Sequence, residues 1–251
     1  ARGMGRGLMD VIPPYDVSMA EGTKIPYAIA NRQVGLVHHD VGVPTGFWRS
    51  VSHSFTAFAV EGFIDEVAYA AKKDPVEFRR EYLKDSPRPL AALELAVEKS
   101  RWAAQPRIAG FGRGIAVHES FGAVVAMVAD VLVTGSEFVV TRLVIAVDCG
   151  FVINPDQVIA QMEGGAIYGL TAVLKNGVEI RDGACVQSNF HDLPVLRIDE
   201  SPAIEAYIVP STAKPGGIGE VAVPPVAPAV ANALFAATRQ RLRSLPLKLD
   251  A

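Results

Sequence analysis

The segment from Lys214 to Thr238 constrains the fold more than any other part of this chain. It joins a glycine-rich turn, Lys214-Pro-Gly-Gly-Ile-Gly-Glu220, to an alanine-rich stretch with no charged side chain between Val221 and Thr238. The spacing predicts a helix over about 226–240, and a helix that is apolar on every side has to be buried. The rest of the chain must therefore supply a core that surrounds this helix.

Glu220 is a single carboxylate placed between the turn and the helix. The glycines at 216, 217 and 219 allow positive φ angles and close approach of the backbone to a bulky ligand. An acid between flexible backbone and an apolar helix is a candidate for a raised pKa and for proton transfer. The alternative from composition alone is an ordinary loop-to-helix connection, with Glu220 as a solvated acid of the first turn.

The composition limits the classes of protein to consider. Half of the 251 residues are hydrophobic, and this length allows one large domain or two small ones. A net charge of −3 without a basic stripe gives no electrostatic case for nucleic acid. Cys149 and Cys185 provide neither a disulfide framework nor metal-ligand spacing, and no apolar run reaches the length of a transmembrane span. Residues 1–7 contain no initiator Met and no signal-peptide pattern, so we expect a piece of something larger or a processed chain.

The periodicity of apolar residues divides the chain into two segments. We expect residues 1–105 to form a helical segment with an initial strand and the loop of Arg49, and residues 106–251 to form an α+β segment. Expected strands cover 34–40, 113–129, 131–133, 137–148 and 204–209, with a hairpin turn at 134–136. Expected helices cover 50–71, 74 onward, 89–99, 154–174 and 226–240, with Asp74 and Asn154 as N-caps, each followed by a proline at the first helical position. A small hairpin is expected between the turn signals at 176–177 and 182–183. Because helices and strands come in blocks, we expect an α+β fold with mixed or antiparallel sheets and packed helices.

Two clusters of reactive side chains have limited support from their spacing. His38-His39-Asp40 could bind a metal, but adjacent strand residues point to opposite faces. Ser120, His191 and Asp192 could form a hydrolase triad, yet the sequence contains no G-x-S-x-G elbow. The glycine-rich turns at 3–7 and 214–219 match neither a dinucleotide fingerprint nor a P-loop.

Two further places could face a large polar ligand. In Gly46-Phe-Trp-Arg-Ser50 a loop enters a helix, and the Arg49 guanidinium with nearby backbone amides would suit an anion. The alternative is a surface arginine at a helix start. Gln161 lies one turn before Gly164 and Gly165, and each glycine inside a helix costs about 1 kcal/mol relative to alanine. We therefore expect close packing there against another helix or a ligand.

Six stretches in order resemble one known family. They are Pro44-Thr-Gly-Phe-Trp-Arg-Ser-Val51, Gly114-Ile-Ala-Val-His-Glu-Ser-Phe-Gly122, Val147-Asp-Cys-Gly150 with Asn154-Pro155, Gln161-Met-Glu-Gly-Gly165, Gln187-Ser-Asn-Phe-His-Asp192 and Pro215-Gly-Gly-Ile-Gly-Glu220. Together they are similar to the molybdenum-binding large subunit of the xanthine dehydrogenase/aldehyde oxidase family. The likeness is greatest to the two-component branch of isoquinoline 1-oxidoreductase beta subunits and related aldehyde dehydrogenases. It covers the chain from about residue 26 and corresponds to the C-terminal part of that subunit.

The resemblance implies roles for residues of this sequence. Glu220 would be the general base at the molybdenum centre, in the oxidation of aldehydes or N-heterocyclic aromatics with water as the oxygen source. Gln161 would hydrogen-bond near the dithiolene and oxo ligands, and Arg49 would lie at the substrate end of the pocket. The remaining implied positions are Phe47 and Trp48 as pocket walls, and Gly216 and Gly217 as the backbone that approaches the metal centre.

The resemblance also implies a cofactor and partners. The cofactor would be molybdopterin cytosine dinucleotide, shared with the missing N-terminal portion, and its dithiolene would hold the metal without protein ligands. The 2Fe–2S clusters would belong to a separate small subunit, with a cytochrome or membrane electron acceptor beyond it. The family includes periplasmic or membrane-associated members, so the compartment stays open between these and the cytoplasm. We expect the isolated chain to bind cofactor poorly and to turn over nothing; the alternative is a non-catalytic structural or assembly fragment of such a complex.

Overall fold

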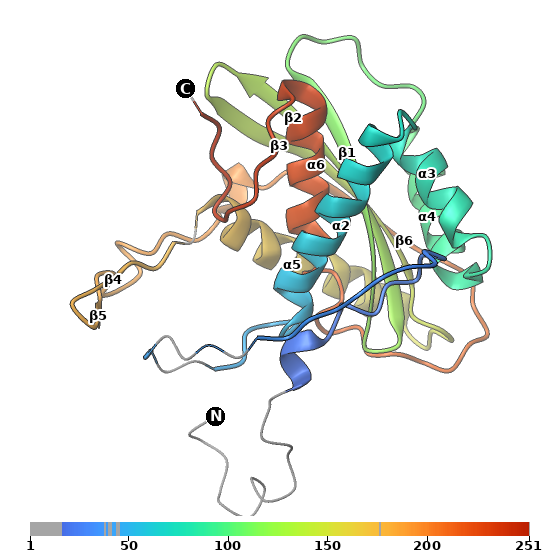
Figure 1. Cartoon of the computed structure of the whole chain (residues 1–251), viewed down its shortest axis with the longest axis horizontal. Helices are drawn as coiled ribbons and strands as arrows, with labels where there is room; N and C mark the ends of the chain where they lie inside the picture. The colour runs from blue at the N-terminus through green and yellow to red at the C-terminus, as the bar shows by residue number, and fades with distance from the viewer. Residues whose placement is uncertain (1–16, 38, 40–41, 44–45, 176, 251) are drawn as a thin grey trace, which may run out of the picture.

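The structure, a computed structural model, describes residues 17–37, 39, 42–43, 46–175 and 177–250. Within these residues five α-helices surround a four-stranded mixed sheet, which confirms the predicted α+β class (Figure 1). The helices are α2 (His53–Ala70), α3 (Pro75–Leu83), α4 (Pro87–Ser100), α5 (Pro155–Leu174) and α6 (Val226–Thr238), with short 3₁₀ helices η1 (Val17–Ala20) and η2 (Ile198–Glu200). The strands are β1 (Phe111–Ser120), β2 (Ala123–Thr134), β3 (Glu137–Asp148), β4 (Ile180–Arg181), β5 (Ala184–Cys185) and β6 (Ala203–Ile208).

The sheet has the order β1-β2-β3-β6. The first three strands are antiparallel, while β3 and β6 are parallel and are connected through α5. A parallel pair needs such a crossover, because a tight turn joins only antiparallel neighbours. The β4–β5 pair is a separate hairpin that stands away from the body of the molecule (Figure 1).

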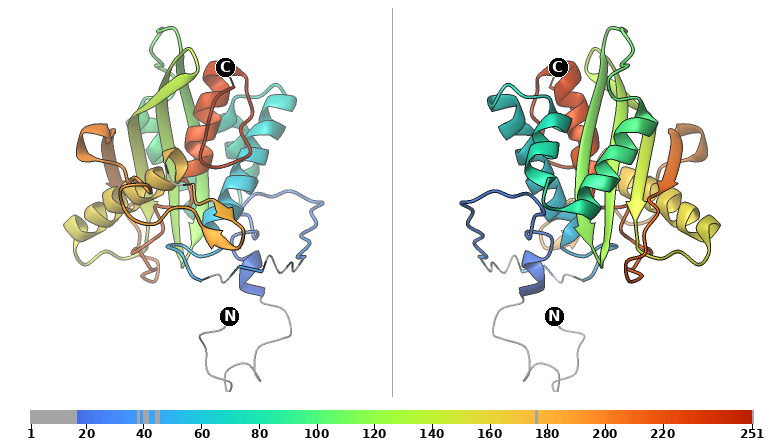
Figure 2. Two further views of the ribbon diagram at one scale, coloured as in Figure 1. Left: turned by 90° about the vertical axis from the view of Figure 1, so that its left-hand side faces the viewer. Right: turned by 90° about the vertical axis from the view of Figure 1, so that its right-hand side faces the viewer.

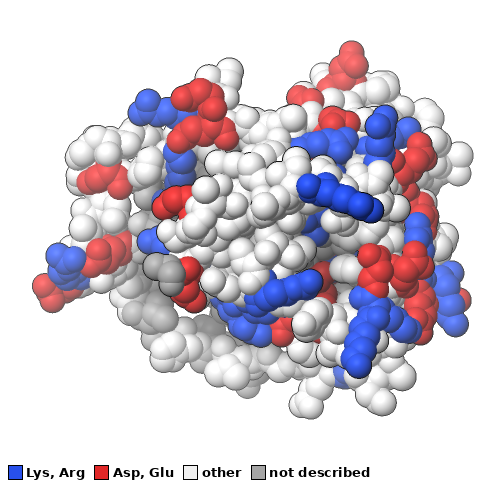
Figure 3. Space-filling view, turned by 90° about the horizontal axis from the view of Figure 1, so that it is seen from above, with Lys and Arg blue, Asp and Glu red and all other residues white. Residues whose placement is uncertain are grey.

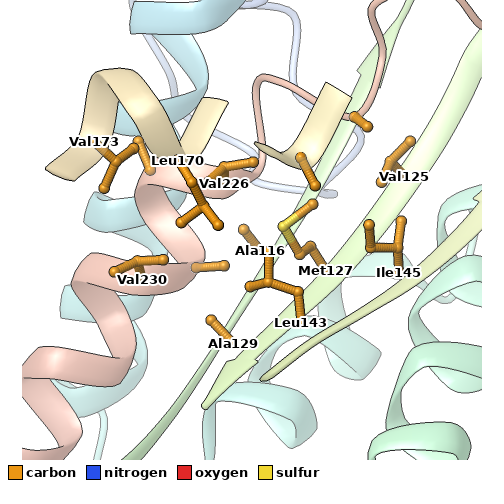
Figure 4. Packing of buried hydrophobic residues seen from close by; sticks show 14 of the residues in the cluster. Ala116, Val125, Met127, Ala129, Leu143, Ile145, Leu170, Val173, Val226 and Val230 are labelled. Atoms are coloured by element: carbon orange, nitrogen blue, oxygen red, sulfur yellow. The ribbon is translucent and has the colours of Figure 1, made fainter. Parts of the chain in front are cut away.

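Helices cover both faces of the sheet (Figure 2). Side chains from α5 and α6 pack on one face, where Leu170 and Val230 meet Met127 and Leu143 of the strands (Figure 4). Side chains from α3 and α4 pack on the other face. Strands covered on both faces are apolar throughout, so β2 is buried from Ala123 to Val131.

The predicted burial of the alanine-rich helix is confirmed. Every residue of α6 from Val226 to Phe235 is buried, and the helix packs directly on β1. Gly114 makes this contact close, since a Cβ there would lie 2.2 Å from the amide nitrogen of Ala233. The helix ends at Thr238 because Arg239 adopts the left-handed conformation, with φ of 67°.

The N-caps read from the sequence are also confirmed. The Asp74 carboxylate accepts hydrogen bonds from the amides of Val76 and Glu77 at the start of α3. The Asn154 side chain accepts from the amide of Gln157 at the start of α5. Such caps satisfy amides that have no partner within the helix.

Two strand predictions are wrong. Residues 34–37 and 39 form no strand, and Val37 is 83% exposed, so the apolar pattern there is not paired with a sheet. The expected single strand over 113–129 is two strands joined by a tight turn at Phe121-Gly122, where both residues have positive φ. The apolar pattern does not mark this turn, because both strands are buried on both faces.

Charged and polar groups meet in the interior beside α2. Glu61 is fully buried and accepts hydrogen bonds from Arg79, from the hydroxyl of Tyr27 and from the amide of Val117. One turn further on, Asp65 forms an ion pair with Arg241. Two of the three acids of α2, Glu61 and Asp65, therefore point inward, and the helix is tied to the N-terminal segment, α3 and β1.

The outside of the molecule carries charges of both signs. On the face seen in Figure 3, lysine and arginine side chains are interspersed with acidic ones. Within the described part of the chain no helix is long and apolar enough to cross a membrane.

Candidate functional site

Arg49 brings two of the predicted site segments together. Its Nε donates to the carbonyl of Gly219 at 3.0 Å, and its terminal nitrogen donates to Oε1 of Gln161 at 3.1 Å. The same terminal nitrogen also contacts the Gly219 carbonyl. A planar guanidinium with several donors is suited to hold such a pair of acceptors in fixed geometry. Segments separated by 112 and 170 positions in the sequence thus meet at one side chain.

Ser50 holds the same glycine loop at its next residue, Glu220. Its amide donates to Oε2 of Glu220 at 2.7 Å, and its hydroxyl donates to the backbone carbonyl of Glu220 at 2.6 Å. Ser50 and Val51 have φ angles of 78° and 42°, which are unusual for residues other than glycine. This conformation delays the start of α2 to His53 and directs the Ser50 amide at the carboxylate, and such strain is commonly found at functional sites.

Two turns at the ends of the strands support the glycine loop. The amide of Gly216 donates to the carbonyl of Cys149 at 2.9 Å, and that of Gly217 donates to the carbonyl of Phe121 at 2.8 Å. A Cβ at Gly216 would lie 2.6 Å from the carbonyl of Gly122. The structure therefore gives Gly216 a packing role, and the predicted approach of Gly216 and Gly217 to a metal centre stays a prediction.

Arg88, at the start of α4, links the two turns. Its guanidinium pairs with the carboxylate of Asp148 and donates to the carbonyls of Asp148 and Gly122. Burial opposes the charge of Asp148, but the hydrogen bonds from Arg88 and from the amide of Gly150 lower its pKa below the usual value. Three of the six family-like stretches thus meet around residues 213–217.

The glycines of α5 have different surroundings. A Cβ at Gly165 would lie 2.9 Å from the Cβ of Ala222, so this glycine allows α5 to pack on the segment after Glu220. A Cβ at Gly164 would meet no heavy atom within 4 Å. The expected close packing is confirmed for Gly165, while open space lies beside Gly164.

The residues present fit a bulky polar cofactor on this open side. Gln161 is exposed, and because Oε1 accepts from Arg49, its amide nitrogen remains a donor without a protein partner among the described residues. Gly164 and Gly219 add no side chain there, and a Cβ at either glycine would meet nothing within 4 Å. A donor beside uncovered backbone is the arrangement that a large group rich in oxygen acceptors requires.

Aromatic rings line the same region. Trp48 lies 4.9 Å from Tyr168 between ring centroids, and the Arg49 guanidinium lies 5.4 Å from the Tyr168 centroid. Phe47 is 75% exposed and Trp48 is 39% exposed. Tyr168 was not predicted as a site residue, although its position seven residues after Gln161 places both on one side of α5.

A pair of histidines near Glu220 was also missed. Nδ1 of His53 and Nε2 of His118 are 2.9 Å apart, so one ring donates a hydrogen bond to the other. Burial and the neighbouring His53 lower the pKa of His118 to about 3. Burial also lowers the pKa of His53, against the opposing effects of Glu21 and Glu220. The two residues are 65 positions apart, and the sequence alone does not indicate that they meet.

The competing reactive clusters are not assembled in the described residues. The hydroxyl of Ser120 is buried without a hydrogen-bond partner, so no histidine activates it and the conceivable hydrolase triad is not assembled. Asp192 instead accepts hydrogen bonds from the backbone amides of Asn189 and Ser188, which lower its pKa to about 2. His38 and Asp40 lie outside the described residues, among which no group of three or more candidate ligands could hold a metal.

Residues 69–202, more than half of the chain, match the family model of the molybdopterin cofactor-binding domain. The chain therefore belongs to this family, as the resemblance predicted. The matched residues include Gln161, whereas Arg49 and Glu220 lie outside them.

Two relatives within the family are similar to nearly the whole of this chain. The chain is 35% identical to the isoquinoline 1-oxidoreductase subunit beta of Brevundimonas diminuta, over 90% of this chain and 30% of that protein. It is 35% identical to the membrane-bound aldehyde dehydrogenase (pyrroloquinoline-quinone) of Gluconacetobacter polyoxogenes, over 94% of this chain and 33% of that protein. The chain thus spans about a third of the length of these relatives.

A solved structure supports the fold. Quinoline 2-oxidoreductase from Pseudomonas putida 86 superposes with a TM-score of 0.70 at 14% identity, over 81% of this chain and 52% of that one. At this identity the likeness extends to the arrangement of helices and strands alone.

Proposed function

We propose that this chain is part of a molybdenum hydroxylase that oxidises aldehydes or N-heterocyclic aromatics, with Glu220 as the general base. The observation that carries this proposal is the joining of three segments by two adjacent residues. Arg49 holds Gln161 and the Gly219 carbonyl, while Ser50 holds the Glu220 carboxylate. Membership of the molybdopterin-binding family and the names of the relatives support the class of reaction.

The side chains of the site have separable tasks in this proposal. When bound, the cofactor would supply the redox chemistry, with water as the source of the oxygen atom. Gln161 and the open backbone at Gly164 would hold and orient it. The amide of Ser50 holds Oε2 of Glu220, and Oε1 has no hydrogen-bond partner within the described residues. Oε1 is therefore the atom that would accept the proton.

The aromatic residues favour a flat substrate. Trp48 and Tyr168 already stack on one another beside Arg49, and Phe47 is exposed next to them. Such rings bind apolar or aromatic molecules through their faces. The names of the relatives mention isoquinoline and an aldehyde, which agrees with this chemistry.

The cofactor form and the partners belong to the proposal as well. We propose molybdopterin cytosine dinucleotide as the cofactor, shared with a polypeptide equivalent to the rest of the relatives' length. Electrons would pass to 2Fe–2S clusters on a separate small subunit, and the name "subunit beta" of one relative is consistent with a multi-subunit enzyme. The name of the other relative specifies pyrroloquinoline quinone, so the experiments should assay both cofactors. The isolated chain should then show no turnover.

Glu220→Gln in the complete complex tests the proposed base. We expect kcat on aldehydes or N-heterocycles to fall by a factor on the order of 10²–10⁴, with molybdenum content unchanged. Glu163→Gln is the matched control, because Glu163 is an exposed acid on the same helix as Gln161. Activity of the Glu220 variant within a few-fold of the wild type would refute the assignment.

A non-catalytic structural or assembly role is the second candidate. The same complex distinguishes it by elemental analysis for molybdenum, by pterin fluorescence and by extraction of quinone. Absence of all three cofactor signals from an intact complex would favour the structural role.

A further inference from the structure

Helix α2 has the reverse of the usual distribution of side chains. Glu61 and Asp65 are buried and paired, whereas Phe55 and Phe63 are 54% and 64% exposed. Phe55, Ala59 and Phe63 are spaced by four residues, so they form one stripe along the helix. We call Phe55, Ala59, Gly62 and Phe63 the α2 stripe. A helix normally shows its polar side to water, so this stripe is a candidate contact surface.

An apolar hollow continues the α2 stripe at its N-terminal end. The hollow is lined by Trp48, Phe55, Phe58, Gly169, Val223 and Leu245. Gly62 adds a flat position within the stripe, where a Cβ would meet nothing within 4 Å. Side chains of another helix or of an apolar segment can fit between the large residues of such a stripe and into the hollow beside it.

The charges around the α2 stripe indicate which kind of partner it fits. The helix itself contains no lysine or arginine, and Arg241, which lies beside it, is paired with the buried Asp65. The stripe therefore differs from helices that lie on anionic membranes with a row of basic side chains. Its one partly exposed acid, Glu66, is paired with Arg243 beyond the stripe. The surface is therefore apolar and uncharged, as in the centre of permanent protein interfaces.

We infer that the α2 stripe and its hollow bind an apolar segment of the polypeptide equivalent to the part of the relatives that this chain does not span. The chain covers about a third of those relatives, so the complete assembly must contain such a polypeptide if it resembles them. The inference extends the proposed function, because it assigns the surface through which the cofactor-binding segments are joined.

Site-specific photo-crosslinking in the complete complex identifies the occupant. Benzoylphenylalanine in place of Phe63 keeps an aromatic side chain at an exposed position, and the crosslinked peptide is sequenced by mass spectrometry. We expect a peptide that aligns with the part of the relatives outside this chain. The same amino acid in place of Ile198, which is 94% exposed on η2, is the control and should give no such crosslink.

Phe63→Asp measures the contribution of the stripe to assembly. We expect the amount of partner polypeptide that copurifies to fall about tenfold or more, as for a central interface residue, while Ile198→Asp leaves it unchanged. Circular dichroism of each variant checks that the chain is folded. Crosslinks only to a second copy of this chain, no crosslink at all, or unchanged assembly of folded Phe63→Asp would overturn the inference.

This result is independent of catalysis. Glu220→Gln should assemble like the wild type, so loss of the proposed base function would leave the crosslinking result unaffected.

Discussion

The imidazole rings of His53 and His118 make the interior sensitive to acid. His118 is 5% exposed, and a Cβ at Gly22 would lie 2.9 Å from Nδ1 of His53, so there is little room for hydration. The two rings share one hydrogen bond, which requires that at least one ring carry an acceptor nitrogen. Glu21 and Glu220 are the acids whose charges act on His53.

Stability should fall as this pair is forced to take up a proton. The pKa of His118 is about 3 in the folded chain and about 6.5 in the unfolded chain, so between these values the unfolded state binds more protons. The contribution of neutral His118 to stability is fully present above about pH 6.5 and is lost as the pH falls toward 3. Over this range the free energy of unfolding falls by up to about 1.4 kcal/mol per pH unit. Urea unfolding at pH 7.5, 6, 5 and 4 measures how steeply the free energy of unfolding changes with pH.

Variants separate this effect from the titration of acids. For His118→Gln, the free energy of unfolding should depend less steeply on pH between pH 6 and 4 than it does for the wild type. His191→Gln should leave the slope unchanged, because the side chain of His191 is 75% exposed. Equal slopes for the wild type and His118→Gln would contradict the prediction.

At the scale of elements, the contact between α6 and β1 depends on glycine. The sequence Gly110-Phe-Gly-Arg-Gly114 runs into the start of β1 and matches no ligand-binding motif. The structure explains Gly112 and Gly114, which lie against the backbone of α6. A Cβ at Gly114 would lie 2.3 Å from the carbonyl oxygen of Ala229. Relief of this clash requires a shift of one of two closely packed backbones, which costs free energy.

Gly114→Ala should destabilise the chain by about 3 kcal/mol or more, because the added methyl separates two packed backbones. Gly164→Ala is the matched control, since its Cβ meets nothing within 4 Å and alanine favours the helix by up to about 1 kcal/mol. Thermal or urea unfolding of both variants provides the comparison. A Gly114→Ala variant as stable as Gly164→Ala would show that α6 does not lie so close to β1.

At the scale of the whole molecule, Glu61 connects the two segments read from the sequence. It lies on α2, within residues 1–105, and accepts a hydrogen bond from the amide of Val117 on β1. It also binds Arg79 of α3 and the hydroxyl of Tyr27. Burial and the nearby carboxylate of Glu61 raise the pKa of Tyr27 well above its usual value, so the hydroxyl stays a donor.

Glu61→Gln should cost about 3–5 kcal/mol, because it leaves the buried guanidinium of Arg79 without its full counter-charge. Glu94→Gln, which breaks a partly exposed pair with Arg80, should cost no more than about 1 kcal/mol. Calorimetry compares the two, and we expect the wild type to unfold in one transition. A loss for Glu61→Gln no larger than for Glu94→Gln would refute the role of the network.

Local signals in the sequence predicted most helices and strands, but they missed the turn between β1 and β2 and wrongly indicated a strand near residue 34. Asp74-Pro75 and Asn154-Pro155 marked the starts of α3 and α5, because caps act within a few residues. The turn at Phe121-Gly122 was missed, because strands buried on both faces have no alternation that a turn would break. Residues 34–37 have an apolar pattern without a strand partner, and pairing depends on distant segments.

Propensity, capping and the order of the motifs predicted the kind of elements, the burial of α6 and the family, because all three can be read along the linear chain. The sequence also predicted the importance of Arg49, Gln161 and Glu220, while their catalytic and binding roles remain proposals. Three features appear only in the folded chain: Arg49 and Ser50 bridge the other segments, His53 meets His118, and the aromatic side of α2 faces outward. These contacts join side chains up to 170 positions apart, so they depend on the packing of the sheet and α6 and not on the local sequence.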